Sequence, residues 1–383
     1  MSSCEVITYK DIPLWKDVTQ EEWDDWRWHM RRRIRTLKDL SAVISLKTWE
    51  ERDIAQVLQR LPMAVTPYFA FHIRRLEESG QMGDAEALKR TVKPDISEIT
   101  TVGFDTDDGV GEELNRPTPC VSQFYDDRVL LSLNNLCSVY CRYCFRKRKV
   151  GRREEFIISE GELRQAIDYI RKNTNIRDVI LSGGDPLSMP DVRLREIISE
   201  IRSIEHVYII RIDTKFPVSL PQRITDDLVS MLKEFHPLFM TLHFTHPGEL
   251  SPETKEKCEK LADAGIPLGT YTPLLKGVND DKEILKRLFL GLIRVRVRPY
   301  YLVHFIETKF AHHFKTSIVK GLEILDGLHG YISGYALPQY VVYLPEGGGK
   351  VPIQPDYIDK QTTEGYWFRN PKGEVQFYPD PTE

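Results

Sequence analysis

Apolar residues recur along this chain with two different periods, and the period changes near residue 128. Residues 1–100 show the steps of three and four that are typical of one face of an α-helix. The opposite face of the segment EEWDDWRWHMRRRIRTL is rich in arginine, and we expect it to be solvated or to contact another subunit, with RNA binding or substrate steering as the lesser alternative. The apolar face of that segment consists of Trp23, Trp26, Met30, Ile34 and Leu37.

After residue 128, apolar strands alternate with amphipathic helices, which implies parallel strands joined by right-handed crossovers. The predicted strands are 128–134, 178–184, 206–214, 239–245, 267–275 and 297–305. Six such units are too few for a closed eight-stranded barrel. We therefore predict an α/β fold with a partial (β/α)6 barrel, in which functional residues lie where strands end and loops begin. The predicted domains are a helical N-terminal region (1–120), the barrel (121–335) and a C-terminal segment (336–383).

Local sequence signals mark individual elements of this predicted fold. Ser159 and Glu162 form a capping box ahead of an apolar stripe, which predicts the start of a helix. A last helix is expected near 316–329, and YVVYLP has the composition of a strand. A glycine-rich turn and a short tail should follow that strand.

Composition and charge exclude several classes of protein. The 383 residues are 41% hydrophobic and 29% charged, as in ordinary globular proteins. The net charge of -4 argues against a non-specific nucleic-acid binder. No segment approaches the roughly 20 apolar residues of a membrane span, and the N-terminal MSSCEVITYKDIP does not resemble a signal peptide. We expect a cytoplasmic protein with no membrane or nucleic-acid partner.

Three cysteines lie close together in CSVYCRYCFRKRK, at a C-x3-C-x2-C spacing. Thiolates this close bind a soft metal or take part in redox exchange. Structural zinc usually takes four ligands, and the other cysteines form no second pair. An iron–sulfur cluster held by three thiolates keeps one iron open for a substrate or cofactor, so we favour a cluster over zinc. The three cysteines are Cys137, Cys141 and Cys144; the others are Cys4, Cys120 and Cys258.

A lysine follows three glycines near the C-terminus, in PEGGGKVP. Val351 stands where a phosphate-binding P-loop needs Ser or Thr, so this is not a P-loop. Taken alone, the segment is typical of a flexible turn with an exposed lysine. The functional alternative is that Lys350 points into the barrel mouth, where burial lowers its pKa and frees its amine for Schiff-base chemistry.

The motif C-x3-C-x-aromatic-C after the first strand of a partial barrel resembles the radical S-adenosylmethionine superfamily. This resemblance implies that the three cysteines hold a [4Fe-4S] cluster and that the turn after the second strand binds the amino group of S-adenosylmethionine. At that turn, glycines let the backbone approach a ligand and Asp185 offers a carboxylate to an ammonium. Without the resemblance, it would be an ordinary turn with a helix-capping Asp. The residues of the turn are Ser182, Gly183, Gly184 and Asp185.

Across nearly its whole length, the chain resembles the lysine 2,3-aminomutase family. The resemblance implies that Lys350 binds pyridoxal 5'-phosphate covalently, that Arg128 with Tyr125 anchors this cofactor, and that Arg146 binds the substrate carboxylate. The basic residues 147–149 are then expected to be solvated or to contact a neighbouring helix. The matching landmarks are WDDWRW, YDDRVLL, CSVYCRYC, LSGGDPL, PQRIT, HFTHPGEL, LADAGIPLG, GVND, VRPYY, SGY and GGGK.

The activity implied by this resemblance is that of an isomerase, an amino acid 2,3-aminomutase that moves an α-amino group to the β-carbon. A one-electron donor such as flavodoxin or ferredoxin and a homo-oligomeric assembly are expected. Two alternatives stay open. One is a short aminomutase that modifies a lysine on a translation factor, and the other is an iron–sulfur or zinc protein that binds nucleic acid.

The sequence departs from the family pattern at several positions. Tyr143 stands where many members have His. Lysine-acting members of the family carry C-terminal cysteines for a structural zinc and a further Cys just after GVND. Here no Cys follows Cys258 and position 281, after GVND, is Asp, so we expect no zinc. Ile306 and Tyr343 align with the two acidic residues that hold the substrate ammonium in lysine enzymes. We therefore predict an uncharged apolar or aromatic substrate, with glutamate second and lysine third. Glutamate would require His304 or Lys309 to reach its side chain.

Overall fold

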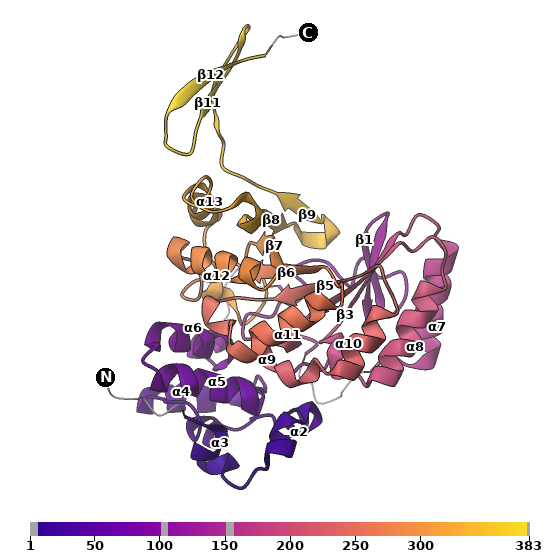
Figure 1. The fold of residues 1–383 in the computed structure, drawn as a ribbon, viewed down its shortest axis with the longest axis vertical. Coiled ribbons are helices and arrows are strands. Elements are labelled where there is room, and N and C mark those ends of the chain that lie inside the picture. The colour runs from indigo at the N-terminus through magenta and orange to yellow at the C-terminus, as the bar shows by residue number, and fades with distance from the viewer. Residues whose placement is uncertain (1–6, 101–105, 151–156, 381–383) are drawn as a thin grey trace.

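The computed structural model describes residues 7–100, 106–150 and 157–380, so Cys4 lies outside the described residues. Figure 1 shows three layers along the long axis of the molecule. Helices of the N-terminal region lie at one end, a large curled sheet with covering helices lies in the middle, and a small C-terminal sheet projects at the other end. Within the described residues, no helix combines the length and apolar character needed to cross a membrane.

The N-terminal region is helical, as predicted, but the predicted long helix after residue 20 is broken. Asp25 has an extended backbone (φ -81°, ψ 109°), and its carboxylate accepts hydrogen bonds from the N–H groups of Arg27 and Trp28. A new helix therefore starts at Trp26, because Asp25 caps it. The helices are α1 (Gln20–Asp24), α2 (Trp26–Arg31), α3 (Leu37–Ser41), α4 (Thr48–Leu58), α5 (Pro67–Glu78) and α6 (Met82–Val92).

The middle layer is a nine-stranded sheet whose strands follow one another in sequence order. Strands β2 to β8 pair in parallel, and β1 and β9 pair antiparallel at the two edges. The strands are β1 (Val121–Tyr125), β2 (Arg128–Ser132), β3 (Asp178–Ser182), β4 (Ile209–Thr214), β5 (Leu238–His243), β6 (Leu268–Pro273), β7 (Val297–Val303), β8 (Gln339–Tyr343) and β9 (Lys350–Pro352).

Helices connect the parallel strands and cover the outer face of the sheet (Figure 1). The predicted capping box is present, since the Ser159 hydroxyl accepts from the N–H of Glu162 at the start of α7. The partial α/β barrel is confirmed, with β8 as an additional parallel strand. The helices are α7 (Glu160–Lys172), α8 (Asp191–Arg202), α9 (Phe216–Ser219), α10 (Asp226–Lys233), α11 (Pro252–Asp263), α12 (Lys282–Arg294) and α13 (Ile318–Asp326).

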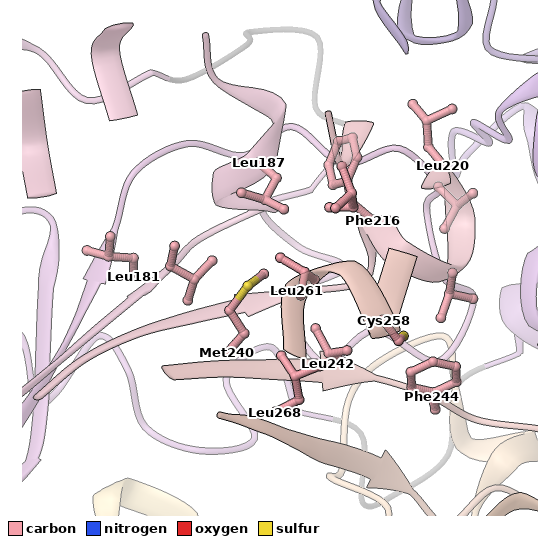
Figure 2. Close-up of a cluster of buried hydrophobic side chains, with 14 of the residues drawn as sticks. Leu181, Leu187, Phe216, Leu220, Met240, Leu242, Phe244, Cys258, Leu261 and Leu268 are labelled. Carbon is pink, nitrogen blue, oxygen red and sulfur yellow. The ribbon is translucent and has the colours of Figure 1, made fainter. Parts of the chain in front are cut away.

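The two faces of the sheet differ in polarity, and β4 shows this clearly. Ile210 and Ile212 are fully buried between the sheet and its helices, whereas Arg211 and Asp213 face the barrel lumen and are partly exposed. Figure 2 shows the apolar side, where Met240 and Leu242 pack near Leu261. Because successive side chains of a strand point to opposite faces, polar residues of these strands collect in the lumen.

The C-terminal tail forms a second sheet, which the sequence analysis did not predict. Three antiparallel strands, β10 (Ile358–Thr362), β11 (Gly365–Arg369) and β12 (Val375–Pro379), project from the body (Figure 1). Arg369 joins this sheet to α13 through a salt bridge of 3.1 Å to Asp326. Strands β11 and β12 are rich in aromatic residues, which favour the pleated structure.

A bidentate salt bridge joins the N-terminal helices to the barrel. Arg75 on α5 donates to both carboxylate oxygens of Glu253 on α11, at 2.7 and 2.8 Å. Partial burial alone would raise the pKa of Glu253, but the bonds from Arg75 lower it to about 2. Glu253 therefore remains ionised in the folded protein at pH values where the unfolded chain has become protonated.

Replacing Glu253 with Gln is expected to lower the free energy of unfolding at pH 7 by about 1 kcal/mol, because the pair is only partly shielded from solvent. The contribution of Glu253 is complete above its ordinary pKa of 4.5 and is lost as the pH falls towards 2. The difference between wild type and variant in urea unfolding should therefore shrink below about pH 4.5. Glu256→Gln, an exposed change on the same helix, is the control. A difference that stays constant with pH would contradict this assignment.

Candidate functional site

The three clustered cysteines follow β2 and line one pocket at the carboxyl ends of the parallel strands. All three are free thiols. Burial raises the pKa of each thiol, to about 11 for Cys144, so without a metal they are protonated at neutral pH. A soft metal would displace these protons, because thiolates and not thiols are its ligands.

The arrangement of the thiols bears on the kind of metal group they could hold. Among the residues that the structure describes, no three His, Cys, Asp or Glu side chains converge closely enough to hold a single metal ion. All three thiols nevertheless line the same pocket. Such a set suits a polynuclear cluster, in which each thiolate binds a different iron.

The basic residues after the last cysteine are paired with acids; Lys147 contacts a neighbouring short helix, as one of the two expectations had it, and Lys149 stays 32% exposed. Their partners lie in residues 98–113, a region without a recognisable motif. Cations in a largely buried loop need such partners, since an unpaired buried charge is costly. Lys147 pairs with Glu98, Arg148 with Asp108 and Glu113, and Lys149 with Glu112 and Glu113.

Glu98 is the most buried of these acids, with a side chain that is 0% exposed. It binds both Lys147 and Arg142, one of the two residues between the second and third cysteines of the motif. Burial opposes the ionisation of Glu98, but the two cations outweigh it and lower the pKa. Residues 134–149, which follow β2 and carry the three cysteines, are called the cysteine loop. The salt bridges of Glu98 therefore join the centre of this loop to the N-terminal region.

Arg33 also contacts the cysteine loop. Its guanidinium donates to the carbonyl oxygen of Cys137 at 2.6 Å and lies 5.7 Å from the ring centroid of Tyr140. The neighbouring Arg31, Arg32 and Arg35 are exposed, as expected for the arginine-rich face. Arg33 belongs to the same arginine-rich segment, and the break after α2 explains why it turns inward.

The glycines of the turn after β3 are required by contacts with the cysteine loop itself. A Cβ on Gly183, which has φ +126°, would lie 2.5 Å from the carbonyl oxygen of Asn134. A Cβ on Gly184 would lie 2.3 Å from the carbonyl oxygen of Leu136. The two backbones therefore pack directly on each other. Gly183 and Gly184 line the same pocket as the three cysteines, which we call the cysteine pocket.

Asp185 connects the ends of β3 and β4. Its buried carboxylate accepts from the Thr214 hydroxyl at 2.8 Å, the Lys215 N–H at 2.8 Å and the Leu187 N–H at 3.1 Å. Burial raises the pKa of Asp185 to about 6 despite these bonds. Most of its acceptor capacity is used within the protein, so any bound ligand would share this carboxylate with Thr214 and the backbone.

Lys350 points into the lumen and is not part of a flexible turn. It starts β9, and its N–H donates to the Tyr125 hydroxyl at 2.6 Å. Its Nζ lies 4.8 Å from the ring centroid of Tyr301 and 5.2 Å from that of Tyr343. Burial lowers the pKa of Lys350 to about 8, so a reactive neutral amine is accessible near neutral pH.

A pocket around Lys350 is also lined by Arg128 and Arg146. Arg128 stacks over the Tyr125 ring at 4.4 Å. Arg146 lines this pocket and the cysteine pocket, so it stands where the two meet. Its Nη1 donates to the Ser182 hydroxyl at 3.1 Å, which links it to the turn after β3.

The two residues predicted to contact the substrate side chain lie on different walls. Ile306 lines the pocket that contains the cysteines, together with Tyr143. Tyr343 lies beside Lys350 and lines the second pocket. The structure therefore brings the predicted site residues to one lumen, with Arg146 between their two groups.

Sequence reasoning missed several polar residues of this lumen. Asp213 on β4 lines the cysteine pocket, and no described residue donates a hydrogen bond or salt bridge to its carboxylate. His243 stacks on Tyr271 with ring centroids 5.2 Å apart, and the buried His243 Nε2 has no hydrogen-bond partner among the described residues. All three stand near strand ends, where function was expected, but no motif singled them out.

Comparisons with known proteins show the family to which the chain is similar. The sequence model of the radical SAM superfamily matches residues 131–288, and that of the lysine-2,3-aminomutase C-terminal region matches residues 325–383. L-lysine 2,3-aminomutase of Clostridium subterminale is 41% identical over 96% of this chain and 87% of its own. The enzyme of the same name from Fusobacterium nucleatum is 42% identical, over 95% and 84%. Glutamate 2,3-aminomutase of Clostridioides difficile is 38% identical, over 93% and 83%.

Proposed function

The chain belongs to the lysine 2,3-aminomutase family of radical S-adenosylmethionine enzymes and is an aminomutase; from this premise we propose that it moves the α-amino group of a free, uncharged α-amino acid to the β-carbon. The observation that carries the proposal is the shared lumen. Three cysteines line one pocket, Lys350 lines the next, and Arg146 stands at their junction.

Each cofactor of the family has matching residues in this lumen. The family uses a [4Fe-4S] cluster, S-adenosylmethionine and pyridoxal 5'-phosphate. The cysteines would hold the cluster, and the glycine turn with Asp185 would receive S-adenosylmethionine beside it. Lys350 would bind pyridoxal 5'-phosphate, whose phosphate suits the cationic Arg128 with Tyr125. Together these groups supply a radical that removes a substrate hydrogen and a carrier for the migrating nitrogen.

The side chains of the lumen have separate roles in this proposal. Arg146 would bind the substrate carboxylate, since a guanidinium forms strong charge-assisted hydrogen bonds to a carboxylate. Lys350, with its pKa lowered to about 8, provides an amine that is partly neutral at pH 7. The buried walls exclude water from the reacting groups. We further propose a flavodoxin or ferredoxin as electron donor and a homo-oligomeric assembly.

The substrate side chain is inferred from Ile306 and Tyr343. Neither residue offers a charge to a substrate ammonium. Burying lysine's ammonium without a carboxylate partner costs about 3–5 kcal/mol, judged by the loss of one member of a buried pair. That cost corresponds to roughly two to three and a half orders of magnitude in specificity. An apolar or aromatic amino acid is therefore the first candidate.

A cationic substrate such as lysine is a second candidate, and Asp213 is the observation that favours it. Its carboxylate lines the same pocket as Ile306 and is not bonded to any described residue. Two of the relatives are L-lysine 2,3-aminomutases. Glutamate is less favoured, because Lys309 pairs with Asp107 at 2.7 Å and His304 bonds to the Tyr340 hydroxyl.

Lys350→Ala is expected to abolish covalent attachment of pyridoxal phosphate and all aminomutase turnover while iron content stays unchanged. The reason is that the variant has no lumen amine at this position. Borohydride reduction followed by mass spectrometry measures the attachment. Lys233→Ala, an exposed change on α10, is the control. Cofactor that borohydride still fixes in Lys350→Ala would show that another lysine holds it.

Cys144→Ala is expected to lose S-adenosylmethionine cleavage and most of the bound iron, and Cys137→Ala and Cys141→Ala should do the same. Cys258→Ala is the matched control, since Cys258 is buried in the apolar core between α11 and the sheet (Figure 2). Iron, sulfide and methionine release are measured after anaerobic reconstitution. Full cleavage activity in Cys144→Ala would overturn the ligand assignment. Zinc without iron or pyridoxal phosphate would instead support the nucleic-acid-binding alternative.

Specificity constants for leucine, tyrosine, glutamate, arginine and lysine test the substrate class. Leucine or tyrosine should exceed lysine by about two orders of magnitude, for the desolvation reason given above. Asp213→Asn separates the two candidates, because only a cationic substrate side chain could lose an ion pair with Asp213. The side-chain contacts of an uncharged substrate should stay the same. If wild type preferred lysine and Asp213→Asn lost that preference, Asp213 would be the ammonium partner and the first candidate would be wrong.

A further inference from the structure

One segment, residues 106–116, contacts three parts of the candidate site, and we call it the strap. It precedes β1 and carries neither a motif nor a predicted role. Its first contact is with the basic residues that follow the last cysteine of the cysteine loop. Glu112 pairs with Arg146 and Lys149, and Glu113 pairs with Arg148 and Lys149.

The strap also packs directly on the turn that carries Lys350. A Cβ on Gly111, which has φ +74°, would lie 2.6 Å from the carbonyl carbon of Glu346. The Asn115 amide donates to the carbonyl oxygens of Gly111 at 2.8 Å and Glu346 at 3.3 Å. A Cβ on Gly347 would lie 2.1 Å from the Asn115 amide nitrogen. The strap backbone therefore packs directly on this turn at Gly111, and the Asn115 side chain bridges the two beside it.

The third contact of the strap is with the wall that contains Ile306. A Cβ on Gly109 would lie 2.0 Å from the carbonyl oxygen of Glu307 and 3.0 Å from Cγ2 of Ile306. The strap thus touches the cysteine loop, the Lys350 turn and the expected side-chain wall. Because a packed interior deforms little, close backbone contacts of this kind fix the positions of these three parts relative to the strap.

Glu112 is the strap residue that reaches the reactive centre. Its side chain is 2% exposed, and its carboxylate accepts from Arg146 Nε at 2.6 Å and from Lys149 Nζ at 3.0 Å. Burial would raise the pKa of Glu112, but Arg146 and Lys149 lower it to about 2. The other side of the Arg146 guanidinium is held by the Ser182 hydroxyl and the Gly183 carbonyl.

We propose that Glu112 is a positioning residue: it fixes the Arg146 guanidinium in the orientation that binds the substrate carboxylate, and through the strap it aligns the cysteine loop with Lys350. This inference rests on the proposed function, in which Arg146 binds that carboxylate. A guanidinium held on two edges keeps its plane fixed when substrate arrives, so less conformational freedom is lost on binding.

Glu112→Gln tests the proposal, with Glu113→Gln as the matched control. Both changes remove one strap carboxylate that pairs with Lys149, but Glu113 does not contact Arg146. In the cofactor-loaded protein, Glu112→Gln should weaken binding of a free amino acid about 10- to 100-fold by calorimetry. Binding of the corresponding amino acid amide, which has no carboxylate, should change little. Glu113→Gln should resemble wild type for both ligands.

The comparison of acid and amide separates positioning from a general structural role. Equal weakening of both ligands, or no weakening of either, would overturn the proposal. Glu112→Asp keeps the charge and should restore part of the preference for the acid. If Glu112→Gln and Glu112→Asp both failed to retain iron and pyridoxal phosphate while Glu113→Gln retained them, Glu112 would be a folding residue and the proposal would be wrong. Failure of the proposed function is distinct, since wild type would then show no aminomutase turnover whatever the binding results.

Discussion

The structure of the site depends on buried carboxylates that neutralise the cations of the cysteine loop. Residues 142–149 carry five basic side chains, and an unpaired charge in a protein interior costs several kcal/mol. Glu98 meets this charge on one side and Glu112 on the other. The cations of this loop can therefore be buried only where these two acids neutralise them. The N-terminal region thus determines where the cysteines lie in the barrel mouth.

Backbone packing then fixes the remaining walls relative to this loop. Gly183 and Gly184 place the turn after β3 directly on the cysteine loop, and Gly111 places the strap on the Lys350 turn. A methyl group at any of these positions would meet main-chain atoms, which cannot rotate away. The two groups of site residues, from strands that are far apart in sequence, are consequently held in one rigid arrangement with Arg146 between them.

The polarity of the lumen follows from the alternation of the strands. On β4, the isoleucines face the helices while Arg211 and Asp213 face the cavity. The same alternation puts His243 and Tyr271 side by side on β5 and β6. Around Lys350, the rings of Tyr301 and Tyr343 remove water from the amine, and the pKa of Lys350 is lowered. An apolar environment of this kind suits reactive intermediates that water would destroy.

The sequence alone indicated the parallel strands of the barrel and the cysteine spacing, because periodicity and short motifs are local properties; Lys350 was singled out only by the family resemblance. It did not reveal that Asp25 divides the first helix, that the tail folds into a sheet, or that residues 147–149 are paired. Glu98, Glu112 and Asp213 belong to no motif, and their importance comes from what they contact. Only the tertiary structure decides such contacts, since charge pairing and backbone packing join residues that are far apart in the chain.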